Sequence, residues 1–569
     1  MPQYLEFKKA RCKDCYKCLR ECPVKAINFK GHQAEIIEDR CILCGHCTLI
    51  CPQNAKIVHS ELDEVKRLLE GPDKVVASVA PSFLSSFNLQ DFTVFKLALA
   101  RLGFADAEET AVGAQAVTQE YARLLKTGEF KNFITSACPA VCRMIQEYYP
   151  KALKYLAPVD SPMVAHAKLI KQQNPDAKIV FLGPCIAKKR EAAESDLIDN
   201  VLTFEEVKQL FDEKGIVLED ITHIQFENNG GAPNLAKEYP VCQGIINSFP
   251  SLPEGYDYIA VDGPRKSVDT LSKIEYLDHV FLEINLCVDA CVNGPCSLVV
   301  DGGSTKSTAD IRKYVSREKQ AKTAPQTEKP LEVNLTASHP RIRSHSMPAS
   351  EKEIESILRR TGKLKPEDEL NCGSCGYSTC REKAWAVYNG YADIDICLPY
   401  MRSRAESLSF EIIQHSPEGI IVLDSDMNIM EVNHKGRELL GINDPNAKGR
   451  PAIDFFNPID FCNAYNQKKR VNCSKMYIPT SNRYIDLSIT YLANQDVLFG
   501  IMKDITEAVN YEEQIQEVKM KTLATTDEVI KKQMRVAQEI ASLLGETTAE
   551  TKVALLKLKK TLTDDKNVK

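Results

Sequence analysis

Two stretches near the amino terminus decide the fold of the first part of the chain: CKDCYKCLRECP at residues 12–23 and CILCGHCTLICP at residues 41–52. Both have the spacing C-x2-C-x2-C-x3-C-P, which bacterial proteins use to bind four-iron clusters. In such pairs, three cysteines of one run share a cluster with the fourth cysteine of the other run. We therefore expect one cluster on Cys12, Cys15, Cys18 and Cys51 and another on Cys41, Cys44, Cys47 and Cys22. Zinc, which also accepts four thiolates, is the alternative.

The composition of the whole chain indicates several domains and more metal. A length of 569 residues predicts about four domains, and the net charge of -6 argues against a nucleic-acid partner. No apolar run reaches the roughly 18 residues of a membrane span, and the amino terminus lacks the apolar segment of a signal peptide. We therefore expect a cytoplasmic protein with no membrane partner. In that compartment, the 21 cysteines are expected to bind metal and not to form disulfides.

Three short segments of the central region carry further chemistry. They are TSACP at 135–139, GPCIAKKRE at 183–191 and EINLCVDACVNG at 283–294. From the residues alone, four thiolates on three distant loops are able to cage one more cluster, with Lys188 as a charged donor to an anionic ligand. The three segments resemble the signature motifs of the FeFe-hydrogenases. That resemblance covers about residues 1–300, including the ferredoxin-like front end.

The resemblance implies a particular active centre. It assigns the H-cluster, a four-iron cubane joined to a two-iron unit with carbonyl, cyanide and dithiolate ligands, to Cys138, Cys185, Cys287 and Cys291. Cys291 matches the thiolate that bridges the two parts. Lys188 matches a lysine that hydrogen-bonds one cyanide, and Ser82 matches a serine that helps to hold the other. The reaction implied is the reversible conversion of hydrogen to protons and electrons, at an open metal site beside a base.

Three departures from the family pattern surround this expected site. Ala137 stands where highly active members have a cysteine that relays protons, and a methyl group neither donates nor accepts a proton. Gly183 and Asn285 replace two methionines, which alters packing and polarity near the two-iron unit. The loss of the relay thiol at Ala137 predicts low turnover. The alternative is a degenerate relative that binds iron–sulfur clusters only.

Five cysteines lack partners at ligand spacing and are expected to be packing residues: Cys142, Cys242, Cys296, Cys462 and Cys473. Cys296 lies five residues after Cys291 and is also a candidate for an alternative proton donor. His46, inside the second cysteine run, is interpreted as a solvated loop residue in preference to one that tunes a cluster.

A third cysteine group lies within NCGSCGYSTCREKAWAVYNGYADIDICLP at residues 371–399. Cys372, Cys375, Cys380 and Cys397 follow the pattern C-x2-C-x4-C-x16-C-x-P. This pattern resembles a small four-iron domain found beside redox and sensory modules, with zinc again the alternative. The preceding Ser350-Glu-Lys-Glu353 predicts the start of a helix by a capping box.

The last third of the chain resembles a sensor. SPEGIIVLDSDMNIMEVNHKGRELLGI at 416–442 and LFGIMKDITE at 498–507 resemble a PAS domain. His415 and His434 are interpreted as surface or core residues in preference to haem ligands. The charged tail after it carries an apolar helical stripe of Met534, Ala537, Ala541 and Leu544, with Gly545 expected to interrupt the helix. The stripe suits a partner helix, or else packing within the same chain.

The expected architecture is multidomain α/β and α+β. It comprises a two-cluster ferredoxin-like domain (1–60), an FeFe-hydrogenase H-cluster domain (73–303), a linker or wrapping tail (304–349), a four-cysteine 4Fe4S domain (350–402), a PAS domain (407–507) and a helical signalling tail (508–569). We expect a sensory FeFe-hydrogenase that binds or slowly oxidises hydrogen. Its expected partners are a redox protein such as ferredoxin, a protein kinase or phosphatase, and a second copy of the chain. A metabolic ferredoxin-linked hydrogenase and an electron-transfer scaffold without the two-iron unit are the alternatives.

Overall fold

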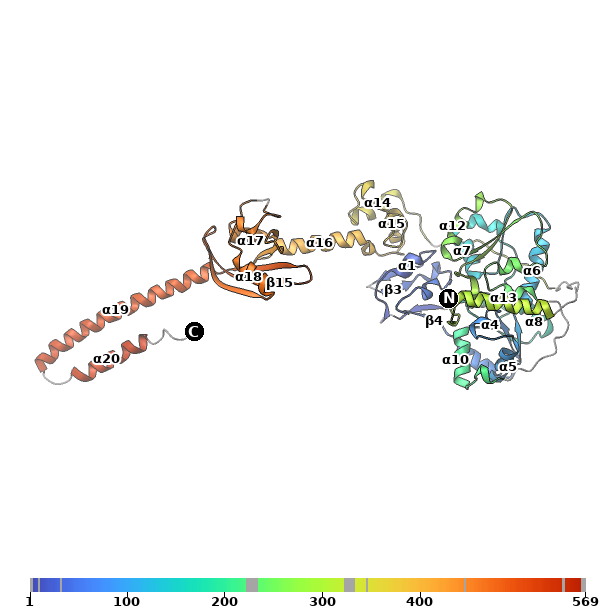
Figure 1. Cartoon of the computed structure of the whole chain (residues 1–569), viewed down its shortest axis with the longest axis horizontal. Helices are drawn as coiled ribbons and strands as arrows, with labels where there is room; N and C mark the ends of the chain where they lie inside the picture. The colour runs from blue at the N-terminus through green and yellow to red at the C-terminus, as the bar shows by residue number, and fades with distance from the viewer. Residues whose placement is uncertain are drawn as a thin grey trace. The chain divides into compact units, whose positions relative to one another are not determined.

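The computed structural model describes residues 4–8, 11–30, 33–221, 234–321, 333–343, 346–444, 447–544 and 548–563. The chain divides into two compact units, Met1–Met401 and Arg402–Lys569 (Figure 1). Within the described residues, no helix is both long enough and apolar enough to cross a bilayer.

The amino-terminal domain is built from two antiparallel strand pairs and short helices that follow the cysteines. β1 (Leu5–Phe7) pairs with β4 (Lys56–Val58), and β2 (Ile27–Lys30) pairs with β3 (Gln33–Ile36). The helices α1 (Lys17–Glu21) and α2 (His46–Leu49) each begin inside one cysteine run. Gly45 precedes α2 with φ of 69°, and a Cβ built on it would lie 2.4 Å from the Cβ of Pro295. The second run is therefore in close contact with the loop of the third central motif.

The central domain contains a four-stranded parallel sheet in the order β6-β5-β8-β9. The strands are β5 (Val75–Val79), β6 (Asp106–Glu109), β8 (Lys178–Gly183) and β9 (Asn200–Thr203). All five residues of β5 are buried, as expected for a parallel strand covered on both faces. The longer helices of this part are α3 (Leu62–Glu70), α5 (Thr93–Leu102), α6 (Ala111–Leu125), α8 (Pro162–Gln173) and α10 (Phe204–Lys214).

A second parallel sheet has the order β10-β11-β7, with β7 (Phe133–Ile134), β10 (Asp257–Asp262) and β11 (Val280–Asn285). The remaining helices of this part are α7 (Pro139–Tyr148), α9 (Ala187–Ala193), α11 (Gly244–Asn247) and α12 (Pro264–Ser272), while the short α4 (Phe83–Ser86) follows β5. The motif residues Cys138, Cys185 and Cys287 come shortly after β7, β8 and β11. The carboxyl ends of strands from two sheets thus supply the three motifs, which is where α/β folds place their ligand sites.

The linker expected from residue 304 is helical over its first part. α13 (Gly303–Ala321) buries Ile311, Tyr314 and Val315 against the central domain. The reason is their three- to four-residue spacing, which the surrounding polar composition conceals. Residues 333–343 have no regular structure apart from a bridge between Thr336 and Val159. This later part contacts the central domain, since Ala337 N donates to the Pro158 carbonyl at 3.0 Å.

The four-cysteine domain packs on the ferredoxin-like domain. α14 (Glu351–Arg360) begins with both hydrogen bonds of the expected capping box, and α15 (Cys380–Tyr388) packs against it. Tyr377 shares one apolar cluster with Leu19 and Phe29, and a Cβ on Gly376 would lie 3.0 Å from Leu19. α16 (Leu398–Gln414) begins directly after Cys397.

The second unit contains a five-stranded antiparallel sheet in the order β13-β12-β16-β15-β14. The strands are β12 (Gly419–Leu423), β13 (Ile429–Val432), β14 (Val471–Ile478), β15 (Arg483–Leu492) and β16 (Val497–Asp504). α17 (His434–Leu440) and α18 (Ile459–Gln467) pack with it around a core that includes Ile421, Leu439 and Phe461.

The tail forms two helices, α19 (Thr506–Leu544) and α20 (Thr548–Thr563), which lie side by side (Figure 1). Lys559 pairs with Asp527 at 3.3 Å across them. Met534 and Ala537 of the expected stripe are half-buried. The side chains of Ala541 and Leu544, and all of Gly545, lie outside what the structure describes.

Candidate H-cluster site

The four cysteines of the central motifs line one cavity of about 110 Å³, together with Ser82, Ala137 and Lys188. Burial raises the pKa of the Cys185 thiol to about 11, and burial with neighbouring thiols raises those of Cys287 and Cys291 further. Such a group of thiols ionises readily only when a cation is bound among them, because metal binding displaces the protons. The donor set therefore fits an iron–sulfur cluster.

One hydroxyl in this cavity lacks a partner among the described residues. Ser82 Oγ is buried and accepts or donates no hydrogen bond, although Ser82 is only 1% exposed. A buried hydroxyl without a partner is costly, and most such groups in proteins are satisfied. A polar ligand such as a cyanide would satisfy it. The residues present thus fit the H-cluster, which Cys138, Cys185, Cys287 and Cys291 would hold with Ser82 and Lys188 at its ligands.

Lys188 is held by two residues that the sequence reasoning did not identify. Its Nζ donates to Ser161 Oγ at 3.0 Å and to Glu191 Oε2 at 2.6 Å. The side chain is on α9, three residues after Cys185, so the helix aims it at the cavity that Cys185 lines. Glu191 lies three residues further along the same helix, and this i,i+3 spacing is a sequence signal that predicts its contact with Lys188.

The three departures from the family pattern alter the lining of the cavity. Ala137 brings only a methyl group. At Gly183, a Cβ would lie 2.7 Å from the ring of Phe181, so Phe181 fills the space that a side chain would need. Asn285 donates to Glu283 Oε1 at 3.2 Å. Burial raises the pKa of Glu283 to about 7, although backbone N–H groups of Ile246 and Ile245, which donate to this carboxylate, lower the pKa.

The cysteines without ligand spacing lie in different surroundings. Cys142 and Cys296 are buried in one apolar cluster, and burial raises the pKa of Cys296 well above its usual range. A thiol with a raised pKa is a poor proton donor, so packing remains the better interpretation of Cys296. Cys242 lines an open groove beside α13. Cys462 and Cys473 lie half-buried in the PAS unit.

A second cavity is lined by Cys22, Cys41, Cys44 and Cys47, the crossed set expected for one ferredoxin-type cluster. Backbone N–H groups donate to cysteine sulfurs in both halves: Ala26 to Cys22 at 3.3 Å, Leu43 to Cys41 at 3.4 Å and Ala55 to Cys51 at 3.4 Å. Such bonds to sulfur stabilise thiolate ligands and tune cluster potentials. For the other cluster, burial raises the pKa of Cys18 to about 11, and the neighbouring thiols of Cys15 and Cys12 also raise it.

In the third cysteine group, burial raises the pKa of Cys375, with Cys397 and Cys372 contributing as neighbours. Lys363 Nζ lies 3.5 Å from Cys397 Sγ, and Cys380 begins α15. Within the described ranges, no three or more His, Cys, Asp or Glu side chains are arranged to hold a single metal ion.

The three candidate histidines lie outside the cavity of the central motifs. His46 is half-buried in α2 and lines the cavity of Cys22 and Cys44. His415 is exposed and pairs with Glu411 at 3.0 Å, and His434 is exposed at the start of α17.

Comparison with protein families matches four parts of the chain. Residues 73–256 match the iron only hydrogenase large subunit, C-terminal domain. Residues 11–55 match a 4Fe-4S dicluster domain, residues 368–399 an Fe-S cluster family and residues 410–505 the PAS fold. These matches favour iron–sulfur clusters over zinc at both outer cysteine groups.

Individual relatives match part of the chain. NADP-reducing hydrogenase subunit HndD of Solidesulfovibrio fructosivorans is 24% identical over 312 residues, 47% of this chain and 52% of that protein. Iron hydrogenase 1 of Clostridium pasteurianum is 30% identical over 245 residues, 36% of this chain and 42% of that protein. The matches thus span about half the length of these two relatives. A solved FeFe-hydrogenase HydA1 variant from Chlamydomonas reinhardtii is 19% identical and covers 49% of this chain and 92% of that one, with a TM-score of 0.35.

The cavity and the family matches together define a class: a multidomain iron–sulfur protein built around the iron-only hydrogenase large-subunit domain. The expected fold class is confirmed, with ferredoxin-like, hydrogenase, small iron–sulfur and PAS domains in that order. More particularly, the chain combines a domain that matches the iron only hydrogenase large subunit with a PAS domain.

Proposed function

We propose that this protein is a sensory FeFe-hydrogenase, which binds or slowly oxidises hydrogen at an H-cluster and signals its redox state. The observation that carries the proposal is the cavity of Cys138, Cys185, Cys287 and Cys291, which combines an unpartnered Ser82 hydroxyl with the methyl of Ala137. The four cysteines and the unpartnered Ser82 hydroxyl suit an H-cluster. The methyl group suits slow turnover, and a sensor needs binding and reduction more than turnover.

Within the cavity, the side chains of this chain bind and orient. When bound, the H-cluster supplies the open metal site and the base that split hydrogen. Lys188, held by Ser161 and Glu191, presents a fixed positive charge to anionic ligands, and Phe181 and Pro184 exclude water. Ala137 breaks the usual proton route at its first step.

Electrons leave through the ferredoxin-like domain. The Cys44 thiol contributes to the raised pKa of Cys287, after burial and the larger contributions of the Cys291, Cys185 and Cys138 thiols. The cluster of Cys22, Cys41, Cys44 and Cys47 is therefore the neighbour of the H-cluster. Burial raises the pKa of Tyr377 in the four-cysteine domain, and the Cys22 thiol contributes to this rise. Electrons thus reach Cys375 and its cluster, or an external redox protein such as ferredoxin.

The signal leaves through the second unit. α16 begins next to the cluster ligand Cys397 and leads to the first PAS strand, β12. A change in cluster charge at Cys397 acts on the first turn of α16, because Met401 N donates to the carbonyl of Cys397 at 2.8 Å. The PAS domain and α19 then pass the change to a cytoplasmic protein kinase or phosphatase.

The infrared spectrum of the matured protein tests this function. Bound carbonyl and cyanide are expected to give bands that shift when hydrogen replaces argon, while hydrogen evolution stays slow. Absence of the bands would identify an electron-transfer scaffold instead. Turnover comparable to that of fast hydrogenases would identify a metabolic enzyme, and either result would overturn the proposal.

The exposed face of α19 predicts a homodimer. Ile515, Val518, Val529 and Val536 are 41%, 62%, 52% and 44% exposed and share one heptad face. Burial of a methylene is worth about 0.8 kcal/mol, so these side chains gain from a second copy. Light scattering is expected to show a dimer of the full chain at micromolar concentration, and a monomer for a chain that ends at Glu507.

A matched substitution locates the contact. Val518→Asp on the exposed face is expected to give a monomer, whereas Lys519→Asp beside it is expected to leave the dimer intact. A full-length monomer would exclude the dimer, and an unchanged dimer after truncation would move the contact away from α19.

A further inference from the structure

Three consecutive side chains of helix α9 reach the central cavity, the ferredoxin-like domain and the point where the chain leaves that domain. Lys188 lines the cavity of the central motifs. Arg190 Nη1 donates to the carbonyl of Cys41, in the ferredoxin-like domain, at 2.9 Å. Between them, Lys189 reaches Glu61, which lies just past β4 where the chain leaves the ferredoxin-like domain. One turn of helix is therefore in contact with both redox domains.

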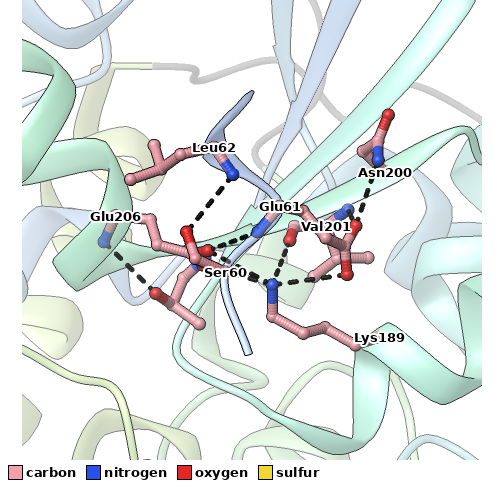
Figure 2. Close-up of polar contacts among 8 residues, drawn as sticks. Ser60, Glu61, Leu62, Lys189, Asn200, Val201 and Glu206 are labelled. Carbon is pink, nitrogen blue, oxygen red and sulfur yellow. Dashed lines mark hydrogen bonds and ion pairs between the residues drawn. The ribbon is translucent and has the colours of Figure 1, made fainter. Parts of the chain in front are cut away.

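Lys189 and its partners form a buried group that we call the junction network: Glu61, Lys189, Val201 and Glu206 (Figure 2). The Lys189 side chain is completely buried. Its Nζ lies 2.8 Å from the Val201 carbonyl and 3.3 Å from both Glu61 Oε1 and Glu206 Oε2. Because the Lys189 ammonium is not exposed, water cannot replace a hydrogen-bond partner that moves away from it.

Glu61 is fixed from two directions. Its Oε2 accepts a hydrogen bond from Val201 N at 2.9 Å, and its own N–H donates to Glu206 Oε1 at 2.9 Å (Figure 2). Burial raises the pKa of Glu206, but Lys189 and hydrogen bonds from Thr203 and Glu61 outweigh burial and hold it below its usual range. Glu206 therefore stays ionised beside Lys189, and the hydrogen bonds with Val201 and Glu206 leave Glu61 little freedom.

A buried lysine between two carboxylates is weak support for stability, because hydrophobic residues of similar volume often do as well. Such groups fix geometry in some proteins. Here the geometry concerned is that of two cluster sites. Cys185 lies just before α9, and the Cys41 carbonyl accepts a hydrogen bond from Arg190 of α9. We propose that Lys189 and Glu61 are positioning residues, which hold the cluster of Cys22, Cys41, Cys44 and Cys47 at a set distance from the central four-iron cluster. The electron-transfer role of this distance rests on the proposed function.

The test uses full-length Glu61→Ala and Lys189→Met, with Lys208→Met as control. Lys208 forms an exposed pair with Asp212 on α10, so the same change there removes a surface charge only. Each protein is reconstituted with iron and sulfide alone and fully reduced. Electron paramagnetic resonance then measures the magnetic interaction between neighbouring clusters. We expect this interaction in the wild type and the control, and we expect it to be weaker in both junction variants at equal iron content.

A second measurement separates position from chemistry. In matured protein, exchange between hydrogen and heavy water takes place at the H-cluster and is expected to be unchanged in Glu61→Ala. Reduction of the ferredoxin clusters by hydrogen is expected to slow about ten- to hundredfold, because small displacements of reacting centres carry large kinetic costs.

The outcomes are distinguishable. Unchanged magnetic interaction in both variants would overturn the positioning role, as would an unchanged reduction rate. Absence of exchange in the wild type would count against the proposed hydrogen chemistry and leave the magnetic result standing. If Lys189→Met fails to fold, Glu61→Ala still decides, because it leaves the Lys189–Glu206 pair in place.

Discussion

Replacement of Cys291 by serine is expected to abolish the infrared bands of the two-iron unit and to leave the ferredoxin-type clusters intact. Cys291 lines the central cavity with Cys138, Cys185 and Cys287, and by family resemblance its thiolate would bridge the two parts of the H-cluster. A serine alkoxide is a much poorer ligand for iron at neutral pH. Loss of this bridge removes the whole unit, so the expected effect is complete.

Cys142→Ser is the matched control for this experiment. Cys142 is buried in the adjoining apolar cluster, and its Sγ donates to the Ser136 carbonyl at 3.4 Å, a bond that serine is able to keep. Infrared bands and iron content are measured on both variants after the same maturation. Survival of the carbonyl and cyanide bands in Cys291→Ser would remove the assignment of Cys291.

Substitution of Ala137 by cysteine is expected to raise hydrogen evolution about a hundred- to ten-thousand-fold, the usual contribution of a general acid–base group. Ala137 lines the cavity next to Cys138, and by family resemblance a thiol there would enter the position of the proton relay. Hydrogen produced with a reduced dye measures the effect.

Ala140→Cys supplies the control, since Ala140 is buried on α7 away from the lining of the cavity. No gain is expected from that thiol. A wild type that already turns over quickly would show that another proton route exists, and an unchanged rate in Ala137→Cys would show that the missing thiol is not what limits turnover.

Spacing within short segments predicted much of this architecture. The doubled cysteine runs predicted that Cys22 lies with Cys41, Cys44 and Cys47, and these four cysteines line one cavity of the structure. Ser350 and Glu353 likewise predicted a helix start that the structure shows.

Contacts between distant segments were not readable from the sequence. Ser161 meets Lys188, and Glu61 meets Lys189, only after the sheet and its helices have assembled. Phe181 and Gly183 lie two residues apart on β8 and so share one face of the strand, but the sequence alone does not show that Phe181 borders the cavity. α13 was concealed for a different reason, since its three buried residues stand in a polar, charged stretch.

Ion pairs of two kinds lie where the ferredoxin-like domain meets the central domain, and salt will act on them differently. Arg265 and Glu21 pair at 2.6 Å with the arginine side chain 84% exposed, whereas Lys189 is completely buried beside Glu61. The screening length falls from about 10 Å at 0.1 M salt to about 3 Å at 1 M, which weakens exposed charges and leaves buried ones nearly untouched. Concentrated salt should therefore weaken the exposed Arg265–Glu21 contact and leave Lys189 paired with Glu61.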